Sequence, residues 1–331
     1  MKSTMPILAV DGGGTKSLAV VYQVEKGVLG MGLGGGSNIQ ITGIDDAMYS
    51  IEDALKKAGA TKIKKFSCAA FAIAGVDTEK DEFVVTQMVR GVLKKLDLEV
   101  EKIIIKNDAV MTLLGTLQDE PGILVLAGTG SIVVASDGKG NLGRAGGWGH
   151  RLKDEGSACY LGKEALVAAF HSYDGRKNAE ILLKSILKLL SLKDISELKE
   201  WIYNSSTTAS DIATLAPLVL ELAAKGDETC SDIVNRAIEE LMLSVNTVYR
   251  KILAPIKKFT LVLQGGLFQH SLFYRQSFIK QFKSIYTDAE IKEPRYQPVV
   301  GAMYLALKSS GYNNYKMEEL KNHPLLLLKN V

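Results

Sequence analysis

Residues 7–14 read Ile-Leu-Ala-Val-Asp-Gly-Gly-Gly, and residues 123–130 read Ile-Leu-Val-Leu-Ala-Gly-Thr-Gly. Each stretch is a short apolar run that ends in a glycine-rich turn and leads into a second apolar run, which is typical of a β-hairpin. The likeness continues downstream, where Lys26-Gly27-Val28-Leu29-Gly30 is echoed at a similar offset by Lys139-Gly140-Asn141-Leu142-Gly143. Two copies of a strand–strand–strand unit, each opening one half of the chain, predict a duplicated protein of two lobes with a cleft.

The segments between and after the two copies alternate between strand patterns and helix patterns. We expect strands at 66–74, 102–106 and 259–263, helices at 45–58, 79–96 and 299–308, and a mostly helical chain from 156 to 253. Such alternation predicts an α/β fold. We assign residues 1–119 and 299–331 to a smaller amino-terminal lobe, and residues 120–298 to a larger carboxy-terminal lobe with a helical insertion.

The composition excludes several classes of protein. The chain has 331 residues, of which 47% are hydrophobic and 23% charged, so global disorder is excluded. A formal net charge of +3 without a long basic block gives no reason to expect nucleic acid or an anionic membrane as a partner. Cys68, Cys159 and Cys230 are too widely spaced for a disulfide scaffold or a zinc ribbon, which favours a reducing cytoplasm. The apolar run at 7–10 is shorter than a signal-peptide core, and no run approaches the roughly 18 residues of a spanning helix.

The first glycine turn, Asp11-Gly12-Gly13-Gly14-Thr15-Lys16, has the chemistry of a phosphate-binding loop. Glycines let successive backbone N–H groups approach phosphate oxygens without interference from Cβ atoms. The turn is neither a Walker A loop nor, between two strands, a dinucleotide fingerprint, and alone it is explained at least as well by an ordinary tight turn. The second copy, Gly128-Thr129-Gly130, strengthens the phosphate interpretation, because two such hairpins across a cleft would hold one polyphosphate. Only the first copy carries a carboxylate, Asp11 against Ala127, which suits either one Mg²⁺ ion held through waters or a cap on the turn.

Further motifs extend this pattern to nearly the whole chain. In order they are the Asp-Gly-Gly-Gly-Thr-Lys-Ser turn, Ala72-Ile73-Ala74-Gly75-Val76-Asp77, Leu126-Ala127-Gly128-Thr129-Gly130-Ser131, Gln264-Gly265-Gly266 and Val299-Val300-Gly301-Ala302. Together they resemble the first phosphate, first connecting, second phosphate, adenosine and second connecting motifs of the actin, Hsp70 and sugar-kinase superfamily. More specifically, Gly146-Gly147-Trp148-Gly149-His150 and Asp154-Glu155-Gly156-Ser157-Ala158 resemble the N-acetylglucosamine kinase branch, which is grouped with BadF/BadG/BcrA/BcrD-type ATPases.

The resemblance implies a duplicated ribonuclease H-like, actin-like ATPase fold, with ATP, Mg²⁺ and a sugar in the cleft, and a homodimer. It implies that Asp108, after the strand at 102–106, accepts the proton of the attacking sugar hydroxyl. Without the family, a cap on the next helix explains Asp108 better. The resemblance also implies which residues bind each ligand. ATP would contact Gly12, Gly13, Gly14, Thr15, Lys16, Gly128, Thr129, Gly130, Gly265 and Gly266. The sugar would contact Ser37, Asn38, Asp108, Ser131, Gly147, Trp148, Gly149 and Asp154, and Asp11 would bind the metal. Taken alone, Trp148 would be a core residue and Lys16 a solvated charge.

Two segments depart from the family pattern. Arg151-Leu152-Lys153 is more basic than the family leads us to expect, so either the sugar is more acidic, such as a muramic-type ether or a phosphosugar, or these cations have only a surface role. The apolar tail at 325–328 has no counterpart, and we expect it to dock on a neighbouring lobe or subunit. We interpret His150 as a structural hydrogen bonder and Asp77 as a cap of the helix that follows it.

These observations favour an ATP- and Mg²⁺-dependent kinase that transfers the γ-phosphate to a hydroxyl of a hexose or N-acetylhexosamine such as N-acetylglucosamine, glucosamine or glucose. Among the hydroxyl groups, we favour the 6-hydroxyl as the acceptor. One alternative is an ATPase that activates an iron–sulfur dehydratase, which would need clustered thiolates. Another is a regulatory switch that binds ATP or a sugar, for which we would expect a helix-turn-helix before Asp11. Fold resemblance alone carries only analogy, so the residue-level matches decide for the enzyme.

Overall fold

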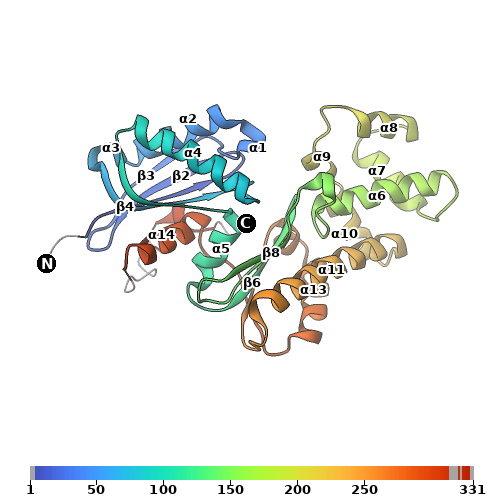
Figure 1. Cartoon of the computed structure of the whole chain (residues 1–331). Helices are drawn as coiled ribbons and strands as arrows, with labels where there is room; N and C mark the ends of the chain where they lie inside the picture. Colours follow the sequence, from blue (N-terminus) through green and yellow to red (C-terminus); the bar gives the residue numbers. More distant parts are fainter. Residues whose placement is uncertain (1–3, 313–319, 321–322, 329–331) are drawn as a thin grey trace. The chain divides into compact units, whose positions relative to one another are not determined.

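The computed structural model describes residues 4–312, 320 and 323–328 of the chain. These residues fall into two compact units (Figure 1). Unit 1 comprises Met1–Gly122, Ser136–Gly140 and Pro294–Val331, and unit 2 comprises Ile123–Ala135 and Asn141–Glu293. The lobe boundaries placed after residues 119 and 298 stay a prediction.

Unit 1 is built on a five-stranded sheet in the order β3-β2-β1-β4-β5. Its strands are β1 (Ile7–Gly12), β2 (Ser17–Gln23), β3 (Gly27–Gly34), β4 (Lys65–Ile73) and β5 (Glu99–Lys106). The first three strands form antiparallel hairpins, and β4 and β5 extend the sheet in parallel from β1. Burial on both faces explains why β1 is a continuous apolar run rather than an alternating one.

Unit 2 repeats this plan in a second five-stranded sheet, ordered β10-β9-β6-β7-β8. Its strands are β6 (Gly122–Ala127), β7 (Ser131–Ser136), β8 (Leu142–Gly146), β9 (Thr260–Gln264) and β10 (Glu290–Lys292). Read from β8 to β10, the order matches that of unit 1 from β3 to β5. The predicted duplication is therefore confirmed.

Helices cover both faces of the sheet in unit 1 (Figure 1). They are α1 (Ile39–Thr42), α2 (Ile44–Lys57), α3 (Ala60–Ile63), α4 (Glu79–Lys95), α5 (Asp108–Leu117) and α14 (Pro298–Ser309), followed by the short turn η4 (Pro324–Leu326). Helices α2 and α4 form a core with one face, and α5 and α14 pack together on the other.

The glycines of β3 are explained by the approach of α2. A Cβ atom on Gly30, Gly32 or Gly34 would lie 2.1–2.3 Å from a backbone carbonyl oxygen of α2 or of Ala58 just after it. The helix therefore lies directly against the strand, and this close approach explains the glycine cluster. A similar approach joins α14 and α5, where a Cβ on Gly301 would lie 1.7 Å from the carbonyl oxygen of Met111.

The helices of unit 2 confirm the mostly helical chain expected from 156 to 253. They are α6 (Ala158–Tyr173), α7 (Glu180–Leu189), α8 (Ile195–Tyr203), α9 (Ala209–Ala213), α10 (Ala216–Ala224) and α11 (Glu228–Val248), continued by η2 (Tyr249–Leu253). After β9 come α12 (Gly266–His270) and α13 (Leu272–Ile285). The apolar stripe of α11, which includes Val234, Ile238 and Leu241, is buried in the core of this unit.

The carboxy-terminal tail packs within unit 1, so the expected docking on a neighbouring lobe or subunit is wrong for its described residues. The Leu328 N–H donates to the carbonyl oxygen of Arg295, and the Gln297 N–H donates to that of Leu326. Leu326 is fully buried, which explains the apolar run. The segment just before α14 thus holds the tail in place.

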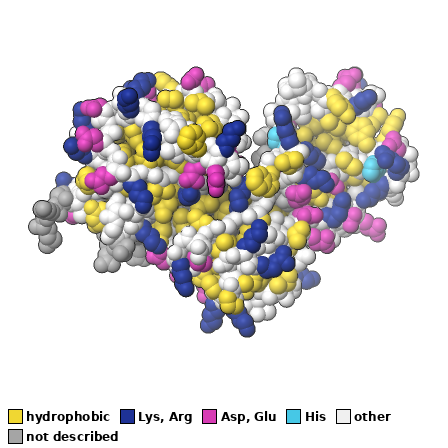
Figure 2. Space-filling view, in the orientation of Figure 1, with side chains coloured by type: hydrophobic (Ala, Val, Ile, Leu, Met, Phe, Trp, Pro, Cys, Tyr) yellow, Lys and Arg dark blue, Asp and Glu magenta, His cyan; other side chains and the backbone are white. Residues whose placement is uncertain are grey.

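The charges on the described surface are mixed in sign. Figure 2 shows lysine and arginine side chains interspersed with acidic ones over the face in view, in keeping with the net charge of +3. None of the helices in the described part of the chain has the length and apolar character needed to cross a membrane.

Candidate functional site

The first glycine turn, between β1 and β2, is fixed by the segment that follows β3. The N–H groups of Ser37 and Asn38 donate to the carbonyl oxygen of Gly13 at 2.9 and 3.1 Å. The Ser37 hydroxyl is buried and accepts from the Ser17 hydroxyl at 2.8 Å, and a Cβ on Gly12 would lie only 2.0 Å from it. Ser37 therefore holds the turn in shape, and its predicted contact with sugar stays a prediction.

Asp11 is a partly buried carboxylate at the end of β1. Burial first, and then the negative charge of Asp108, raise the pKa of Asp11 to about 7, against an opposing effect of Lys16. Thr15 and Lys16 themselves are exposed at the tip of the turn. The negative charge of Asp108, at the start of α5, thus acts electrostatically on Asp11 in β1, within unit 1.

Asp108 opens α5, but Asn107 caps the helix. The Asn107 side-chain oxygen accepts from the Ala109 N–H at 2.9 Å, and its amide nitrogen donates to Asp77 at 3.2 Å. Burial raises the pKa of Asp108, the charge of Asp77 adds to this effect, and backbone hydrogen bonds oppose it. The capping explanation for Asp108 is therefore wrong, although its carboxylate also lies 3.0 Å from the Ala109 nitrogen.

The loop after β4 connects this acidic group to Asn38. The Gln40 side chain donates to the Gly75 carbonyl oxygen at 3.0 Å, and a Cβ on Gly75 would lie 2.7 Å from Asn38 Oδ1. Asn38 Oδ1 itself accepts from the Gln40 N–H and caps α1. Asp77 does not cap α4, as the sequence suggested: Thr78 does, in a capping box with Asp81. Unit 1 thus links Asn38, through the Gly75–Asp77 loop, to Asn107 and Asp108.

The second glycine turn, between β6 and β7, is fixed from the start of α6. The Ala158 N–H donates to the Gly128 carbonyl oxygen at 2.8 Å, and the Ser131 hydroxyl donates to the Glu155 carbonyl oxygen at 2.7 Å. Ser131 is buried. Space remains open beside Gly128, where a Cβ would meet nothing within 4 Å.

Asp154 connects this turn to the Trp-Gly-His segment. Its Oδ1 accepts from the Gly149 N–H at 2.8 Å, and its Oδ2 would lie 2.9 Å from a Cβ on Gly130. A Cβ on Gly147 would be 2.8 Å from Ile132. Trp148, which alone suggested a core residue, is 57% exposed and stacks under the Arg144 guanidinium at 4.5 Å. Ser131, Gly147, Trp148, Gly149 and Asp154 therefore lie together in unit 2.

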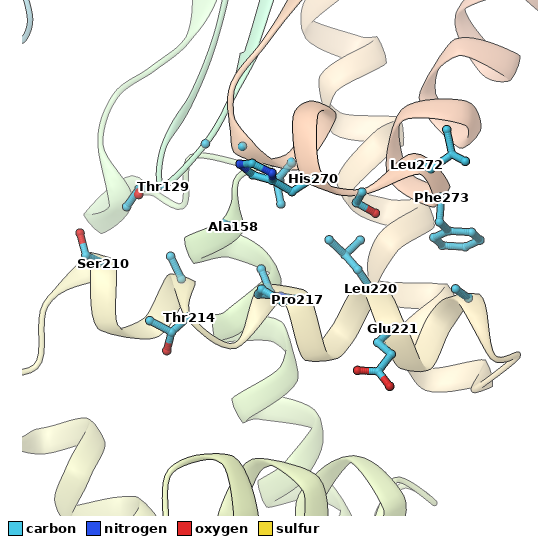
Figure 3. A pocket seen from close by; sticks show the side chains of 17 residues that line it. Thr129, Ala158, Ser210, Thr214, Pro217, Leu220, Glu221, His270, Leu272 and Phe273 are labelled. Atoms are coloured by element: carbon cyan, nitrogen blue, oxygen red, sulfur yellow. The ribbon is translucent and has the colours of Figure 1, made fainter. Parts of the chain in front are cut away.

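A cavity of about 650 Å³ opens beside the second glycine turn. Gly128, Thr129 and Gly266 form one end, and mostly apolar residues of α9 and α10 form one wall, with the start of α13 opposite. In Figure 3 the Leu220 side chain points from α10 toward the wall that carries His270 and Leu272. Gly265, which precedes Gly266 in the sequence, has φ 105°, and a Cβ on it would be 2.3 Å from the Ala127 carbonyl oxygen.

The α10 wall and His270 were not predicted from the sequence. Residues such as Pro217 and Leu220 look like core residues in a helical stretch, and nothing in their spacing separates a cavity wall from a core face. The sequence did point to this region through Gly128 and Gly266, which were predicted to contact ATP and which both line the cavity. An apolar slot of this size suits a flat heterocyclic base.

Two sheets of the same strand order, each opening on a glycine hairpin, define an actin-like ATPase. The chain belongs to the BadF/BadG/BcrA/BcrD ATPase family, whose sequence profile matches residues 8–306. This confirms the family that the motifs indicated.

Two relatives are similar to this chain over nearly their whole length. The chain is 31% identical over 304 residues to an N-acetylmuramic acid/N-acetylglucosamine kinase of Clostridium acetobutylicum, covering 91% of this chain and 97% of that protein. It is 30% identical over 316 residues to an N-acetyl-D-glucosamine kinase of Dictyostelium discoideum, covering 91% and 98%.

Solved structures share the fold. A candidate N-acetylglucosamine kinase of Chromobacterium violaceum superposes with a TM-score of 0.67 at 27% identity, covering 92% of this chain and 99% of that chain. A ROK family glucokinase of Streptomyces griseus superposes with a TM-score of 0.52 at 17% identity, covering 92% and 99%, which shows the fold alone.

Proposed function

We propose that this chain is an ATP-dependent carbohydrate kinase that phosphorylates N-acetylglucosamine or a closely related amino sugar, with the 6-hydroxyl as the favoured acceptor. One observation carries the proposal: Asp108 offers a partly buried carboxylate of raised pKa at the start of α5, where Asn107 has taken over the cap. Relatives named as kinases of N-acetylglucosamine and N-acetylmuramic acid support the acceptor class.

In the proposed reaction Asp108 accepts the proton of the sugar hydroxyl. The hydroxyl oxygen forms a bond to the γ-phosphorus, the bond from that phosphorus to the β–γ bridging oxygen breaks, and ADP leaves. A carboxylate whose pKa is raised by burial binds this proton more readily than an ordinary aspartate does. Asn38, beside the Gly75 loop, would orient the sugar through its amide.

Asp11 fits a role in holding Mg²⁺. It is a carboxylate of raised pKa that faces the charge of Asp108, while Lys16, the cation that opposes this effect, is exposed. A divalent ion would compensate this charge, and Mg²⁺ keeps several waters and needs few protein carboxylates. When bound, the ion would neutralise charge on the ATP phosphates.

The cavity of unit 2 would take the adenosine part of ATP. Its apolar walls suit the base, and Gly266 permits a close approach to the backbone. The glycine turn at 128–130 lies at the end of the cavity, where the phosphates would follow the ribose. We further propose that Gly12, Gly13, Gly14 and Thr15 contact phosphate from unit 1.

The described thiols do not favour an iron–sulfur activator. Cys68 is buried in β4, and Cys159 and Cys230 are buried in helices of unit 2. Burial raises the pKa of each thiol, which disfavours the thiolate that binds iron. None of the three is exposed where a second chain could share a cluster.

The test is ADP release with purified protein and a panel of glucose, mannose, glucosamine, N-acetylglucosamine, N-acetylmannosamine and N-acetylmuramic acid. We expect at least one amino sugar to stimulate ADP release strongly and to give a phosphorylated product. Asp108→Asn should retain ATP binding and lose about 10²–10⁴-fold in turnover. The exposed Asp46 provides the control, and Asp46→Asn should behave as wild type. An ATPase rate indifferent to every sugar would favour a regulatory switch instead.

A further inference from the structure

A buried tyrosine links the wall of the cavity in unit 2 to the segment that holds the second glycine turn. Tyr274 lies in the first turn of α13, directly after Ser271, Leu272 and Phe273, which line the cavity. Its side chain is fully buried in the core of the unit, where the centre of its ring lies 5.5 Å from that of Phe268. Any role of Tyr274 in the proposed reaction is therefore indirect.

The Tyr274 hydroxyl donates to a backbone carbonyl that is 118 residues away in the sequence. The acceptor is the Gly156 carbonyl oxygen at 2.7 Å, and the hydrogen bond is buried. Burial raises the pKa of Tyr274, so the phenol keeps its proton and acts as a donor. Such a bond is costly to break, because the carbonyl left behind would stay buried without a donor.

Gly156 lies in the middle of a short segment, residues 154–158, here called the strap. It has φ 83°, and a Cβ on it would lie 2.3 Å from the Leu241 side chain of α11. The strap is thus held from two sides at this glycine, by the close approach of α11 and by the Tyr274 hydroxyl from α13. Loss of the hydroxyl would free one of these two sides.

The strap in turn holds the second glycine turn. The Ala158 N–H donates to the Gly128 carbonyl oxygen at 2.8 Å, and the Ser131 hydroxyl donates to the Glu155 carbonyl oxygen at 2.7 Å. These bonds flank the Gly156 carbonyl on either side along the chain. A shift of the strap at its middle would therefore move the glycine turn, which forms one end of the cavity.

The other end of the strap leads to the Trp-Gly-His segment. The Ser157 N–H donates to the Asp154 carbonyl oxygen at 3.1 Å, and Asp154 Oδ1 accepts from the Gly149 N–H at 2.8 Å. The strap thus connects the glycine turn with the residues for which we predict sugar contacts. The Tyr274 hydroxyl binds at the middle of this connection.

We propose that Tyr274 is a positioning residue for phosphoryl transfer. Through the Gly156 carbonyl it fixes the strap, and through the strap it sets the glycine turn at which the β- and γ-phosphates of ATP would lie. The inference rests on the proposed function, because that function places the phosphates at this turn. It adds a residue that aligns the phosphates without contact with ATP or with the sugar.

Tyr274→Phe tests the inference, because it removes the hydroxyl and keeps the buried ring. Calorimetry should show an affinity for ATP lowered about tenfold and an affinity for AMP within about twofold of wild type, since the cavity wall at Leu272 and Phe273 stays in place. With the sugar that wild type uses best, kcat should fall about 10–100-fold. More ADP should be released per sugar phosphate formed, because a misplaced γ-phosphate is transferred to water more often.

Tyr286→Phe is the matched control. Tyr286 follows the last residue of the same helix, and its hydroxyl donates to the Asn246 side chain at 2.7 Å, so this variant also loses one hydrogen bond within unit 2. It should bind ATP and AMP as wild type does and give the same ratio of ADP to sugar phosphate. Thermal unfolding of both variants shows how far each loses stability, and the assays are run where both are folded.

A second variant keeps the inference testable if Tyr274→Phe does not fold. Ser131→Ala releases the neighbouring carbonyl of the strap and should also weaken ATP binding more than AMP binding. If Tyr274→Phe folds, the double variant should show a smaller loss than the product of the two single losses, because both hydroxyls hold the same strap.

Three results would overturn the inference. The first is an equal loss of affinity for ATP and AMP in Tyr274→Phe, or in Ser131→Ala where that variant replaces it. The second is a lower stability of Tyr274→Phe with an unchanged ratio of ADP to sugar phosphate, which would leave Tyr274 a residue of the core alone. The third is the same difference between ATP and AMP in Tyr286→Phe, because the effect would then follow from lost stability.

Nucleotide binding separates this failure from that of the proposed function. A selective loss of ATP affinity in Tyr274→Phe, with no sugar phosphorylated by wild type, would support the positioning role and refute the kinase. Phosphorylation of a sugar by wild type, with no selective loss in the variant, would do the reverse.

Discussion

Asp11 at the end of β1 faces the negative charge of Asp108 at the start of α5. Burial and, after it, this charge raise the pKa of Asp11 to about 7, whereas the ordinary value is 3.8. The folded protein therefore holds a proton on Asp11 more tightly than the unfolded chain does. By linkage, this residue makes the fold less stable as the pH rises from about 4 to about 7, and the loss is complete above that range. A cation bound at Asp11 would relieve the cost.

The first prediction is that Asp11→Asn stabilises the protein at pH 8 while it abolishes activity. One pKa unit corresponds to about 1.4 kcal/mol, so a pKa raised from 3.8 to about 7 sets an upper bound of about 4 kcal/mol. Because Asp11 is only partly buried, solvent screens part of this effect, and the gain in free energy of unfolding should be on the order of 2 kcal/mol. Urea unfolding of both proteins between pH 4 and 8 measures it, and their difference cancels the other titrating groups. Mg²⁺ should stabilise wild type and leave the variant unaffected. Parallel pH profiles of the two proteins would contradict the prediction.

The second prediction concerns the space beside the glycine turns. A Cβ on Gly128 would meet nothing within 4 Å, and one on Gly13 would lie 3.6 Å from the Lys16 carbonyl oxygen, an ordinary contact. Gly13→Ala and Gly128→Ala should therefore change the free energy of unfolding by no more than about 0.5 kcal/mol. If phosphates approach these backbones, each methyl group should weaken ATP binding about tenfold.

Calorimetric titration with ATP and AMP tests the second prediction. Each variant should lose affinity for ATP and retain that for AMP, because AMP lacks the β- and γ-phosphates. If only one variant is affected, then only that hairpin binds the polyphosphate. An equal loss for both nucleotides would contradict the assignment of these turns to the terminal phosphates.

Short-range features of the sequence predicted most of the fold. The repeated apolar run before each glycine turn located both hairpins, because a continuous apolar run bounded by glycine has few other solutions. The small residues Gly301 and Ala302, in the helix predicted at 299–308, are compatible with the close approach of α14 to α5. The glycines of β3 were harder, because the partner that makes them necessary, α2, is found only from the packed structure.

The candidate site was less accessible from the sequence, because its chemistry depends on contacts between distant segments. In Asn107-Asp108 either residue can cap a helix, and only the backbone shows that Asn107 does. The raised pKa of Asp11 needs the proximity of Asp108, which no spacing reveals. The α10 wall of the cavity has the same apolar spacing as a core helix, so Leu220 gave no separate signal.

The third prediction contrasts two glycines inside helices. A Cβ on Gly301 would lie 1.7 Å from the Met111 carbonyl oxygen, a backbone atom that cannot move alone, so Gly301→Ala should force α14 and α5 apart and destabilise unit 1 by several kcal/mol. A Cβ on Gly91 in α4 would meet only the end of the flexible Met48 side chain at 3.3 Å. Gly91→Ala should therefore be neutral or stabilise by up to about 1 kcal/mol through helix propensity.

Thermal unfolding of the two glycine variants checks the third prediction. If both helices respond alike, helix propensity rather than close packing explains the glycine at 301.

The last prediction concerns Asp77, whose charge adds to the burial that raises the pKa of Asp108. Asp77→Asn removes this charge but keeps an oxygen that can accept from the Asn107 amide, so the variant isolates the electrostatic effect. The pKa of Asp108 should fall. Because a general base must be unprotonated, the fall of kcat on the acidic side should then begin at a lower pH than in wild type.

A pH profile of kcat at saturating ATP, sugar and Mg²⁺ measures this shift, since kcat reports groups in the enzyme–substrate complex. Asp46→Asn, which removes one exposed acidic charge on α2, should leave the acidic limb in place. Asn107→Ala provides a second comparison: it removes the α5 cap and should cost about 1 kcal/mol in the free energy of unfolding. If Asp77→Asn lowers kcat at every pH but does not shift the pH at which kcat begins to fall, then Asp77 only shapes the loop. A shift to lower pH would mean that its charge tunes the base.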